Sequence, residues 1–127
     1  LGPARGQSRR IGRLGSPAPA ATSVSYSPVI AQHHSMVFDR IRNAAYSSAL
    51  AAVIKPDSRV LDLGAGVGVL GLEAARLGAR RVYLVDPSAV VHAAAGVARD
   101  NNLEERVEVV QSPIEDFDPG EKVDIIL

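Results

Sequence analysis

The chain has 127 residues, of which 46% are apolar, 22% charged and 4% aromatic, and its formal net charge is zero. This length fits one domain at most, and this composition is typical of a globular protein. The absence of cysteine excludes disulfide scaffolds, cysteine-ligated metal sites and thiol nucleophiles, and no apolar run approaches the roughly 18 residues that span a bilayer.

The N-terminal part differs from the rest of the chain. Residues 1–25 are rich in Gly, Pro, Ala, Ser and Arg and lack periodicity, so we expect a disordered basic tail. Three interpretations stay open: a plain solvated tail, a remnant of an organelle transit peptide, and an arm that contacts RNA. We expect a cytoplasmic or nuclear protein, or an imported one if the tail is a transit remnant. The first residue is leucine, which indicates a fragment, a processed product or an incomplete gene model.

A helix is predicted over residues 35–54, with Ser35 as its N-cap and Pro56 just beyond its end. Its polar stripe joins Asp39, Arg42 and Tyr46, which recur at helical spacing. Its apolar stripe is expected to face the core and to contain Val37, Ile41, Ala45 and Ala52, with Leu50 and Ile54 beside it.

From residue 59 onward the chain alternates strands and helices. Strands are predicted over residues 59–63, 81–85, 107–111 and 123–127. The first helix follows a glycine-rich turn and stops at Gly78, and the second runs from Asp86 to about Asn101. Short loops between alternating strands and helices predict an α/β fold with a parallel, doubly wound sheet and right-handed crossovers.

The turn between the first strand and the first helix has the sequence Asp-Leu-Gly-Ala-Gly-Val-Gly (62–68). Glycine there permits a positive φ and a close approach of a ligand. The spacing of Gly66, Gly68 and Gly71 formally fits a dinucleotide-binding turn. However, Asp62 precedes the glycines, and its carboxylate would repel a pyrophosphate. It suits a cationic ligand such as S-adenosylmethionine, which carries a sulfonium and an ammonium group.

Asp86 ends the second predicted strand, 22 residues after Gly64. A carboxylate at this position can accept hydrogen bonds from both ribose hydroxyls of a nucleotide. This fits NAD and S-adenosylmethionine equally. The plain alternative is an aspartate that only caps the following helix.

Residues 60–68 (Val-Leu-Asp-Leu-Gly-Ala-Gly-Val-Gly) resemble motif I of class I S-adenosylmethionine-dependent methyltransferases. The spacing of His33, Met36, Asp39, Arg42 and Tyr46 resembles the helix that precedes motif I in protein arginine methyltransferases, and segments 74–82, 101–107 and 115–126 fit the same family. The resemblance runs without gaps from about residue 33 to residue 127. It implies a Rossmann-like class I methyltransferase fold over residues 26–127, incomplete after the first four parallel strands.

The resemblance also implies S-adenosylmethionine as the cofactor and assigns its contacts. His33 and Arg42 would lie over the methionine end, where the Arg42 guanidinium would pair with the carboxylate. Asp86 would hold the ribose diol, where the family usually has glutamate. Ile114 and Glu115 would flank the adenine. The full expected set is His33, Arg42, Asp62, Gly64, Gly66, Gly68, Asp86, Ile114 and Glu115.

Ordinary alternatives stay open for several of these residues. Arg42 could pair with Asp39 on the helix surface, His33 could be a loop histidine, and Glu115 could be a solvated acid.

The resemblance places the acceptor site outside this chain. In protein arginine methyltransferases, two glutamates on a loop after the fourth strand orient the guanidinium substrate, and that loop would follow Leu127. We therefore assign no catalytic residue and no metal site, and expect this chain to bind the cofactor only. The parent enzyme would methylate arginine in a protein, could form a homodimer, and would need no membrane or nucleic acid. The alternatives are a class I methyltransferase with another acceptor, a non-catalytic module that uses the nucleotide pocket, and, more distantly, an NAD-dependent oxidoreductase.

Overall fold

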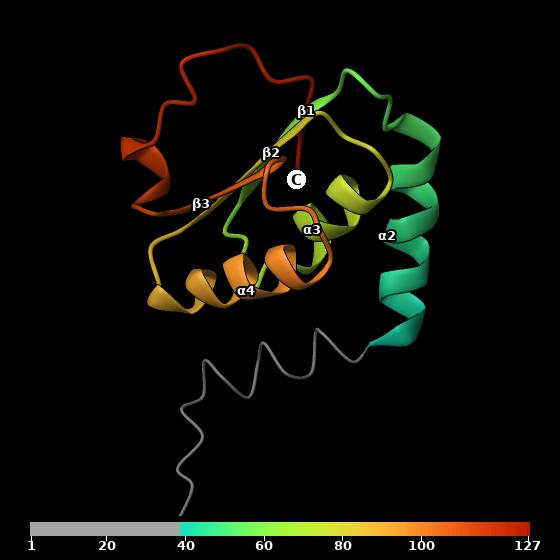
Figure 1. Ribbon diagram of the computed structural model, residues 1–127, viewed down its shortest axis with the longest axis horizontal. Coiled ribbons are helices and arrows are strands. Elements are labelled where there is room, and N and C mark those ends of the chain that lie inside the picture. Colours follow the sequence, from blue (N-terminus) through green and yellow to red (C-terminus); the bar gives the residue numbers. More distant parts are fainter. Residues whose placement is uncertain (1–38) are drawn as a thin grey trace, which may run out of the picture.

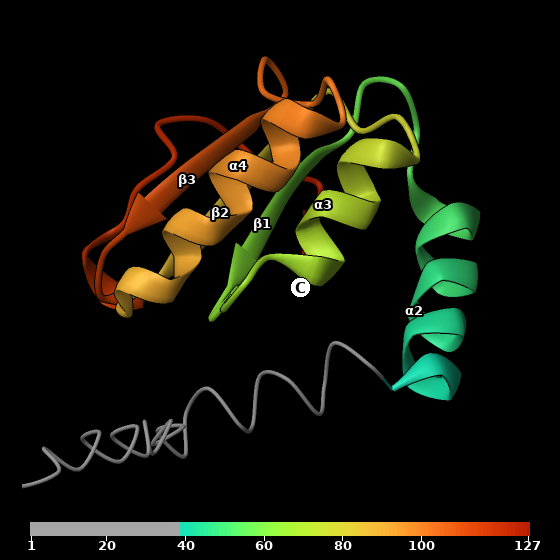
Figure 2. The ribbon, with the colours of Figure 1, turned by 60° about the horizontal axis from the view of Figure 1, so that its bottom comes forward.

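The computed structural model describes residues 39–127, which form a parallel sheet with helices packed on one face (Figures 1 and 2). In chain order the elements are α2 (Arg40–Val53), β1 (Arg59–Leu63), α3 (Val69–Arg76), β2 (Arg81–Asp86), the 3₁₀ helix η1 (Ala89–His92), α4 (Ala93–Asp100), β3 (Val107–Gln111), the 3₁₀ helix η2 (Ile114–Asp116) and β4 (Ile125–Ile126). Within the described part of the chain, no helix is both long and apolar enough to cross a membrane.

The sheet has the strand order β3-β2-β1-β4, and every pair of neighbours is parallel. This order confirms the predicted Rossmann-like arrangement of parallel strands. Helices α3 and α4 cover one face, and the segment between β3 and β4 covers the other. The bounds of β1 and β3 are those expected from the sequence, whereas β4 is shorter than the predicted 123–127. Because all strands run in one direction, their carboxyl ends meet at one edge of the sheet, where ligands bind in this class of fold.

Glycine ends α3 as the sequence predicts. Gly78 has a φ of +104°, which a residue with a side chain rarely adopts. Its N–H donates to the carbonyl of Ala75 (3.0 Å), and the N–H of Ala79 donates to that of Ala74 (3.1 Å). This pair of bonds is a Schellman motif, which satisfies the last carbonyls of the helix and turns the chain into β2.

The two faces of the sheet bury alternate residues of each strand. The face under α3 and α4 holds the larger core: Val60, Ala74, Ala75, Ala79, Val82, Leu84, Val91 and Ala94. The opposite face buries Leu61, Tyr83 and Val85. Phe117 and Val123, from the segment between β3 and β4, pack against it.

Helix α2 lies beside α3, and the predicted face of this helix is wrong (Figure 2). Ile41 is 86% exposed, and Ala45 and Ala52 are exposed as well. Leu50 is buried and Ile54 is half-buried against the core. Val37, the remaining member of the predicted apolar stripe, lies outside the described residues. The correction therefore rests on the exposure of Ile41, Ala45 and Ala52.

The cap of α2 also differs from the expectation. Asp39 is the N-cap, and its Oδ1 accepts a hydrogen bond from the backbone N–H of Arg42 (3.0 Å). Ser35, the expected cap, lies outside the described residues, as does the predicted tail over residues 1–25.

Candidate cofactor-binding site

The glycine turn after β1 is built from left-handed residues. Gly64, Gly66 and Gly68 have φ values of +73°, +56° and +84°. The N–H groups of Gly64 and Ala65 donate to the carbonyl of Val85 (2.8 and 3.0 Å), which ties the turn to the end of β2. A side chain added at Gly64 would meet no atom within 4 Å. The turn therefore presents open backbone to a ligand.

Two buried aspartates bind backbone N–H groups of the glycine turn and of α3. Asp62, on β1, accepts a hydrogen bond from the N–H of Gly71 (Oδ2, 3.0 Å). Asp86, at the end of β2, accepts from the N–H groups of Gly66 (Oδ2, 2.9 Å) and Ser88 (Oδ1, 2.8 Å). Both side chains are therefore satisfied by backbone donors, as buried carboxylates require. Asp86 therefore links the glycine turn to the residues after β2. The helix cap considered as an alternative role for Asp86 belongs to Ser88, which is the N-cap of η1. Each Asp86 oxygen keeps a further lone pair for a ligand.

The charge of Asp62 is costly in this position. Burial raises the pKa of Asp62 from 3.8 to about 6; the Gly71 N–H opposes this and the neighbouring Asp86 charge adds to it. At neutral pH the carboxylate is still mostly ionised. A cation placed beside it would gain a strong partner, because the surroundings screen the interaction weakly.

A cavity of about 260 Å³ lies between α2 and the glycine turn. One wall carries Arg42 and Tyr46 from α2, and the other carries Asp62 and Gly64. The remaining lining residues are Asn43, Leu63, Ala65, Val67, Val69, Leu70 and Leu127. A guanidinium and a carboxylate thus line the same space. This pair of charges fits a zwitterionic amino-acid group.

The guanidinium of Arg42 stacks on the ring of Tyr46, with 5.3 Å between Cζ and the ring centroid. The polar stripe predicted on α2 is therefore confirmed for these two residues. Asp39 accepts the backbone N–H of Arg42, and no ion pair joins the two side chains in the described residues. The alternative of a surface ion pair with Asp39 is thus wrong.

The expected adenine contacts lie at the same edge of the sheet but outside this cavity. Ile114 is 41% exposed and Glu115 is exposed, both in η2, which follows β3. The N–H of Ser112 donates to the carbonyl of Asp86 (3.0 Å), which keeps this segment beside the end of β2. Within residues 39–127 the Glu115 carboxylate makes no hydrogen bond, so it is available to a ligand. His33 lies outside the described residues.

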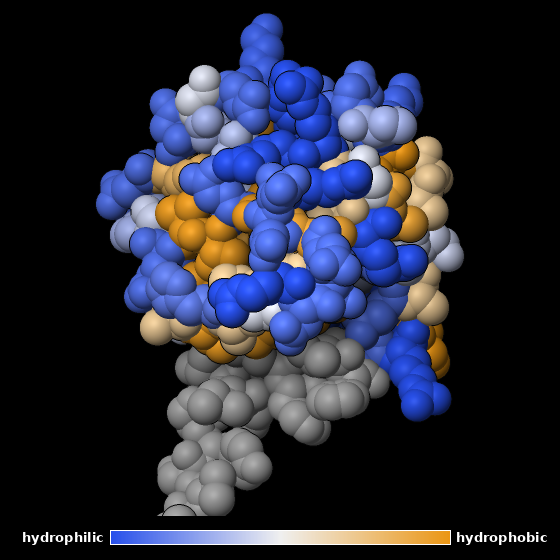
Figure 3. All heavy atoms as spheres, in the orientation of Figure 1, coloured by the Kyte–Doolittle hydropathy of each residue, from blue (hydrophilic) through white to orange (hydrophobic). Residues whose placement is uncertain are grey.

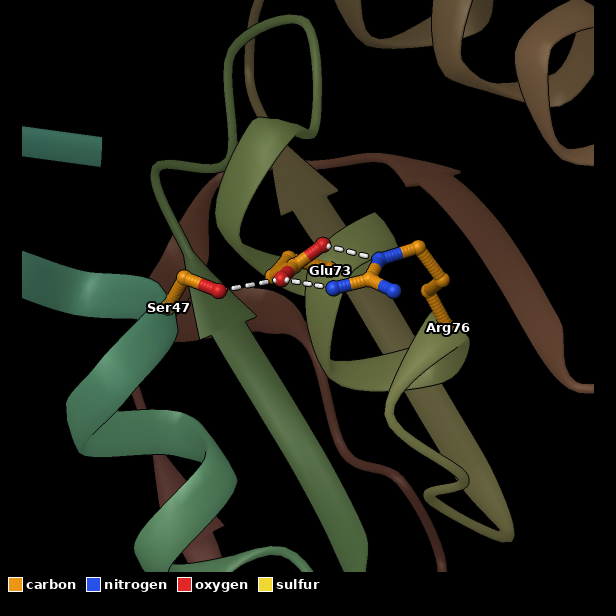
Figure 4. A network of polar contacts seen from close by, with 3 residues as sticks. All are labelled: Ser47, Glu73 and Arg76. Atoms are coloured by element: carbon orange, nitrogen blue, oxygen red, sulfur yellow. Dashed lines mark hydrogen bonds and ion pairs between the residues drawn. The ribbon is translucent and has the colours of Figure 1, made fainter. Parts of the chain in front are cut away.

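A polar network between α2 and α3 was not predicted from the sequence (Figure 4). The Ser47 hydroxyl donates to Glu73 (2.5 Å), and Arg76 donates to both carboxylate oxygens of Glu73 (2.6 and 2.7 Å). Hydrogen bonding from Arg76 lowers the pKa of Glu73, so this acid stays ionised. The i,i+3 spacing of Glu73 and Arg76 could have indicated their pairing. Nothing local in the sequence signals the contact with Ser47, because it joins two helices.

A parallel sheet with a glycine turn and strand-end carboxylates at its carboxyl edge defines the Rossmann-like class of nucleotide-binding folds. A family model described as ribosomal protein L11 methyltransferase (PrmA) matches residues 46–127. The chain therefore belongs to this methyltransferase family.

Several proteins similar to this chain are protein arginine methyltransferases, which confirms the resemblance found in the sequence. The chain is 39% identical over 105 residues to protein arginine N-methyltransferase 6 of Danio rerio, covering 81% of this chain and 30% of that protein. It resembles the structure of a Trypanosoma brucei PRMT1 enzyme–prozyme heterotetrameric complex with AdoHcy (TM-score 0.70, 39% identity, 75% of this chain and 31% of that one). Arabidopsis thaliana protein arginine methyltransferase 10 is also similar (TM-score 0.71, 35% identity, 76% and 28%). The chain spans less than a third of the length of these relatives.

Proposed function

We propose that this chain binds S-adenosylmethionine between α2 and the glycine turn, and that the protein transfers its methyl group to arginine in a protein substrate. The observation that carries the proposal is the placement of Arg42, Asp62 and Gly64 around one cavity. The methionine part of the cofactor bears a carboxylate, an ammonium and a sulfonium. The cavity offers a cation, an anion and open backbone to match them.

Each residue would have a separate task. Arg42 would pair with the cofactor carboxylate, since a guanidinium fork matches that group. Asp62 would attract the cationic end, and the backbone at Gly64 would let the methionine chain approach. Asp86 would accept from the ribose hydroxyls while it holds the turn. Ile114 and Glu115 would contact the adenine. The bound cofactor would supply an electrophilic methyl group on a sulfonium.

The acceptor is proposed from the relatives. The family model names ribosomal protein L11, whereas the relatives that are 39% or more identical over three quarters of this chain or more are named for arginine or PRMT1. We favour arginine as the methyl acceptor because the similarity to these relatives includes the whole of α2. The family model matches α2 only from residue 46 onward. Among the described residues that line the cavity, Asp62 is the one acid, and its Oδ2 accepts a hydrogen bond from the N–H of Gly71. Carboxylates that orient a guanidinium would therefore come from elsewhere in the protein.

Calorimetric titration with S-adenosylhomocysteine tests the cofactor site. Arg42→Ala should weaken binding about 10- to 100-fold, the effect of losing a charged hydrogen bond in a partly closed site. Arg80→Ala is the matched control, since Arg80 is exposed and lies away from the cavity. Equal affinity of the Arg42 variant and the unmodified chain would contradict the proposed site.

The acceptor is tested on the whole protein that contains this chain. After incubation with S-adenosylmethionine labelled in its methyl group, protein substrates are hydrolysed and their amino acids separated. We expect the label in methylarginine. Label confined to another amino acid would reject the arginine acceptor and leave the cofactor site standing.

A further inference from the structure

The apolar residues of α2 that are buried or packed against the core lie at its C-terminal end. Leu50 is the buried residue of the helix, and Ile54, its C-cap, packs against the core. Arg42 lies eight residues before Leu50, which is about 12 Å along a helix axis. The apolar anchor is thus remote from the side chain that lines the cavity.

The Ser47–Glu73 hydrogen bond lies nearer to Arg42 than this anchor. It joins the middle of α2 to α3 at 2.5 Å and is half-buried. Arg76 clamps the same carboxylate from the other side with two hydrogen bonds (Figure 4). Glu73 is therefore ionised and held in one orientation, which makes it a rigid acceptor for the helix opposite.

Helix α3 connects this clamp to the glycine turn. Gly68 is the N-cap of α3, so the turn and Glu73 belong to one rigid element. One end of α3 carries the backbone that faces the cavity, and its middle holds α2. Glu73 thus links α2, which carries Arg42, to the element that begins at the glycine turn.

We propose that Glu73 is a positioning residue, which holds α2 through Ser47 so that Arg42 faces the glycine turn. The inference rests on the proposed function, because it assumes that Arg42 binds the carboxylate of the cofactor. It goes further, because it assigns part of the affinity for that carboxylate to Glu73, which does not line the cavity.

The role predicts a selective effect on ligands. A ligand that carries the amino-acid group needs Arg42 in place, whereas 5′-methylthioadenosine lacks that group. A loss of general stability would weaken both ligands alike. A displaced Arg42 weakens only S-adenosylhomocysteine.

The experiment is calorimetry of both ligands on Ser47→Ala, Glu73→Ala and the unmodified 127-residue chain. Both variants should bind S-adenosylhomocysteine about three- to tenfold more weakly, as expected for one net hydrogen bond, and 5′-methylthioadenosine within about twofold of normal. Ser48→Ala is the matched control, since Ser48 is the exposed neighbour on the same helix, and it should change neither affinity. In an Arg42→Ala background, Ser47→Ala should cause no further loss.

The other outcomes distinguish a failure of the proposed function from a failure of the positioning role of Glu73. If the unmodified chain does not bind S-adenosylhomocysteine, the proposed function falls and the inference with it. If it binds, but the variants lose both ligands equally or lose neither, the positioning role alone is overturned. A further loss in the Arg42→Ala background would also overturn it.

Discussion

The ionised side chain of Asp62 lowers the stability of the fold. It is 5% exposed, and burial raises its pKa to about 6. Because the folded-state pKa lies above the ordinary value of 3.8, the ionised form disfavours folding, and this cost grows as the pH rises from about 4 to about 6. A charge kept at such a cost is typical of functional positions.

Asp62→Asn should therefore stabilise the chain without ligand. The amide oxygen can still accept from Gly71, while the buried charge is gone. We expect the free energy of unfolding at pH 7.5 to rise by about 1–3 kcal/mol, with the gain shrinking toward pH 4. Urea denaturation at both values measures this. A variant that is less stable than the unmodified chain at pH 7.5 would contradict the account.

The same carboxylate should make ligand binding depend on pH. Since the pKa of Asp62 is about 6, roughly a tenth of the molecules carry the charge at pH 5, and nearly all at pH 7.5. The affinity for S-adenosylhomocysteine should be about tenfold lower at pH 5. Asp62→Asn should flatten this profile in calorimetric titrations. A steep profile in that variant would assign the dependence to another group.

Asp86 connects the turn to the strand end. Its two oxygens accept from two backbone donors, so Asp86→Asn leaves one donor facing an amide NH₂ group. The free energy of unfolding should fall by about 1–2 kcal/mol. Asp57→Asn, at an exposed turn position, is the control and should stay within about 0.5 kcal/mol. Equal stability of both variants would show that the turn does not depend on Asp86.

At the scale of elements, the contact of α3 with the sheet depends on Gly71. A Cβ added there would collide with Leu84 and approach Asp62 Oδ2 to 3.0 Å and Val82 Cγ1 to 3.2 Å. Residues 82 and 84 are fully buried, so neither can give way easily.

Gly71→Ala should lower the free energy of unfolding by about 1–3 kcal/mol, the usual cost of overpacking. Gly96→Ala is the control, because Gly96 lies in α4 with nothing within 4 Å of an added Cβ. That variant should gain about 0.5–1 kcal/mol from helix propensity. The opposite signs of the two substitutions can be read from thermal unfolding curves. A stabilising Gly71→Ala would disprove the close packing of α3.

Some elements could be predicted from the sequence and others could not. The strands around Val60, Val82 and Val109 were predictable because each is rich in Val and Leu and lies between turn residues. The buried face of α2 was not, since alanines recur on several of its faces and do not select one. Leu50 selects the face, and Ser47 meets a partner 26 residues away. Such long-range contacts leave no local pattern.

The residues of the candidate site could likewise be predicted only in part. The glycine turn, Asp62 and Asp86 could be predicted, because they sit at strand ends in a recurring pattern. Their hydrogen bonds to Gly71 and Gly66 could not, since these depend on how tightly α3 and the turn fold back on the sheet.

In the whole molecule, the site is assembled from two parts that meet through α3. The sheet edge supplies the turn and both aspartates, and α2 supplies Arg42 and Tyr46. Helix α2 also exposes Ile41 and Val53, and Figure 3 shows hydrophobic atoms along the side of the molecule that α2 forms.

The central claim is that the glycine turn serves S-adenosylmethionine and not a dinucleotide. Titrating the chain with S-adenosylhomocysteine and with NAD under the same conditions tests it most directly. The account predicts that S-adenosylhomocysteine binds at least about tenfold more tightly, because Asp62 favours a cation and like charges repel a pyrophosphate. NAD binding as tightly as S-adenosylhomocysteine, or more tightly, would contradict it.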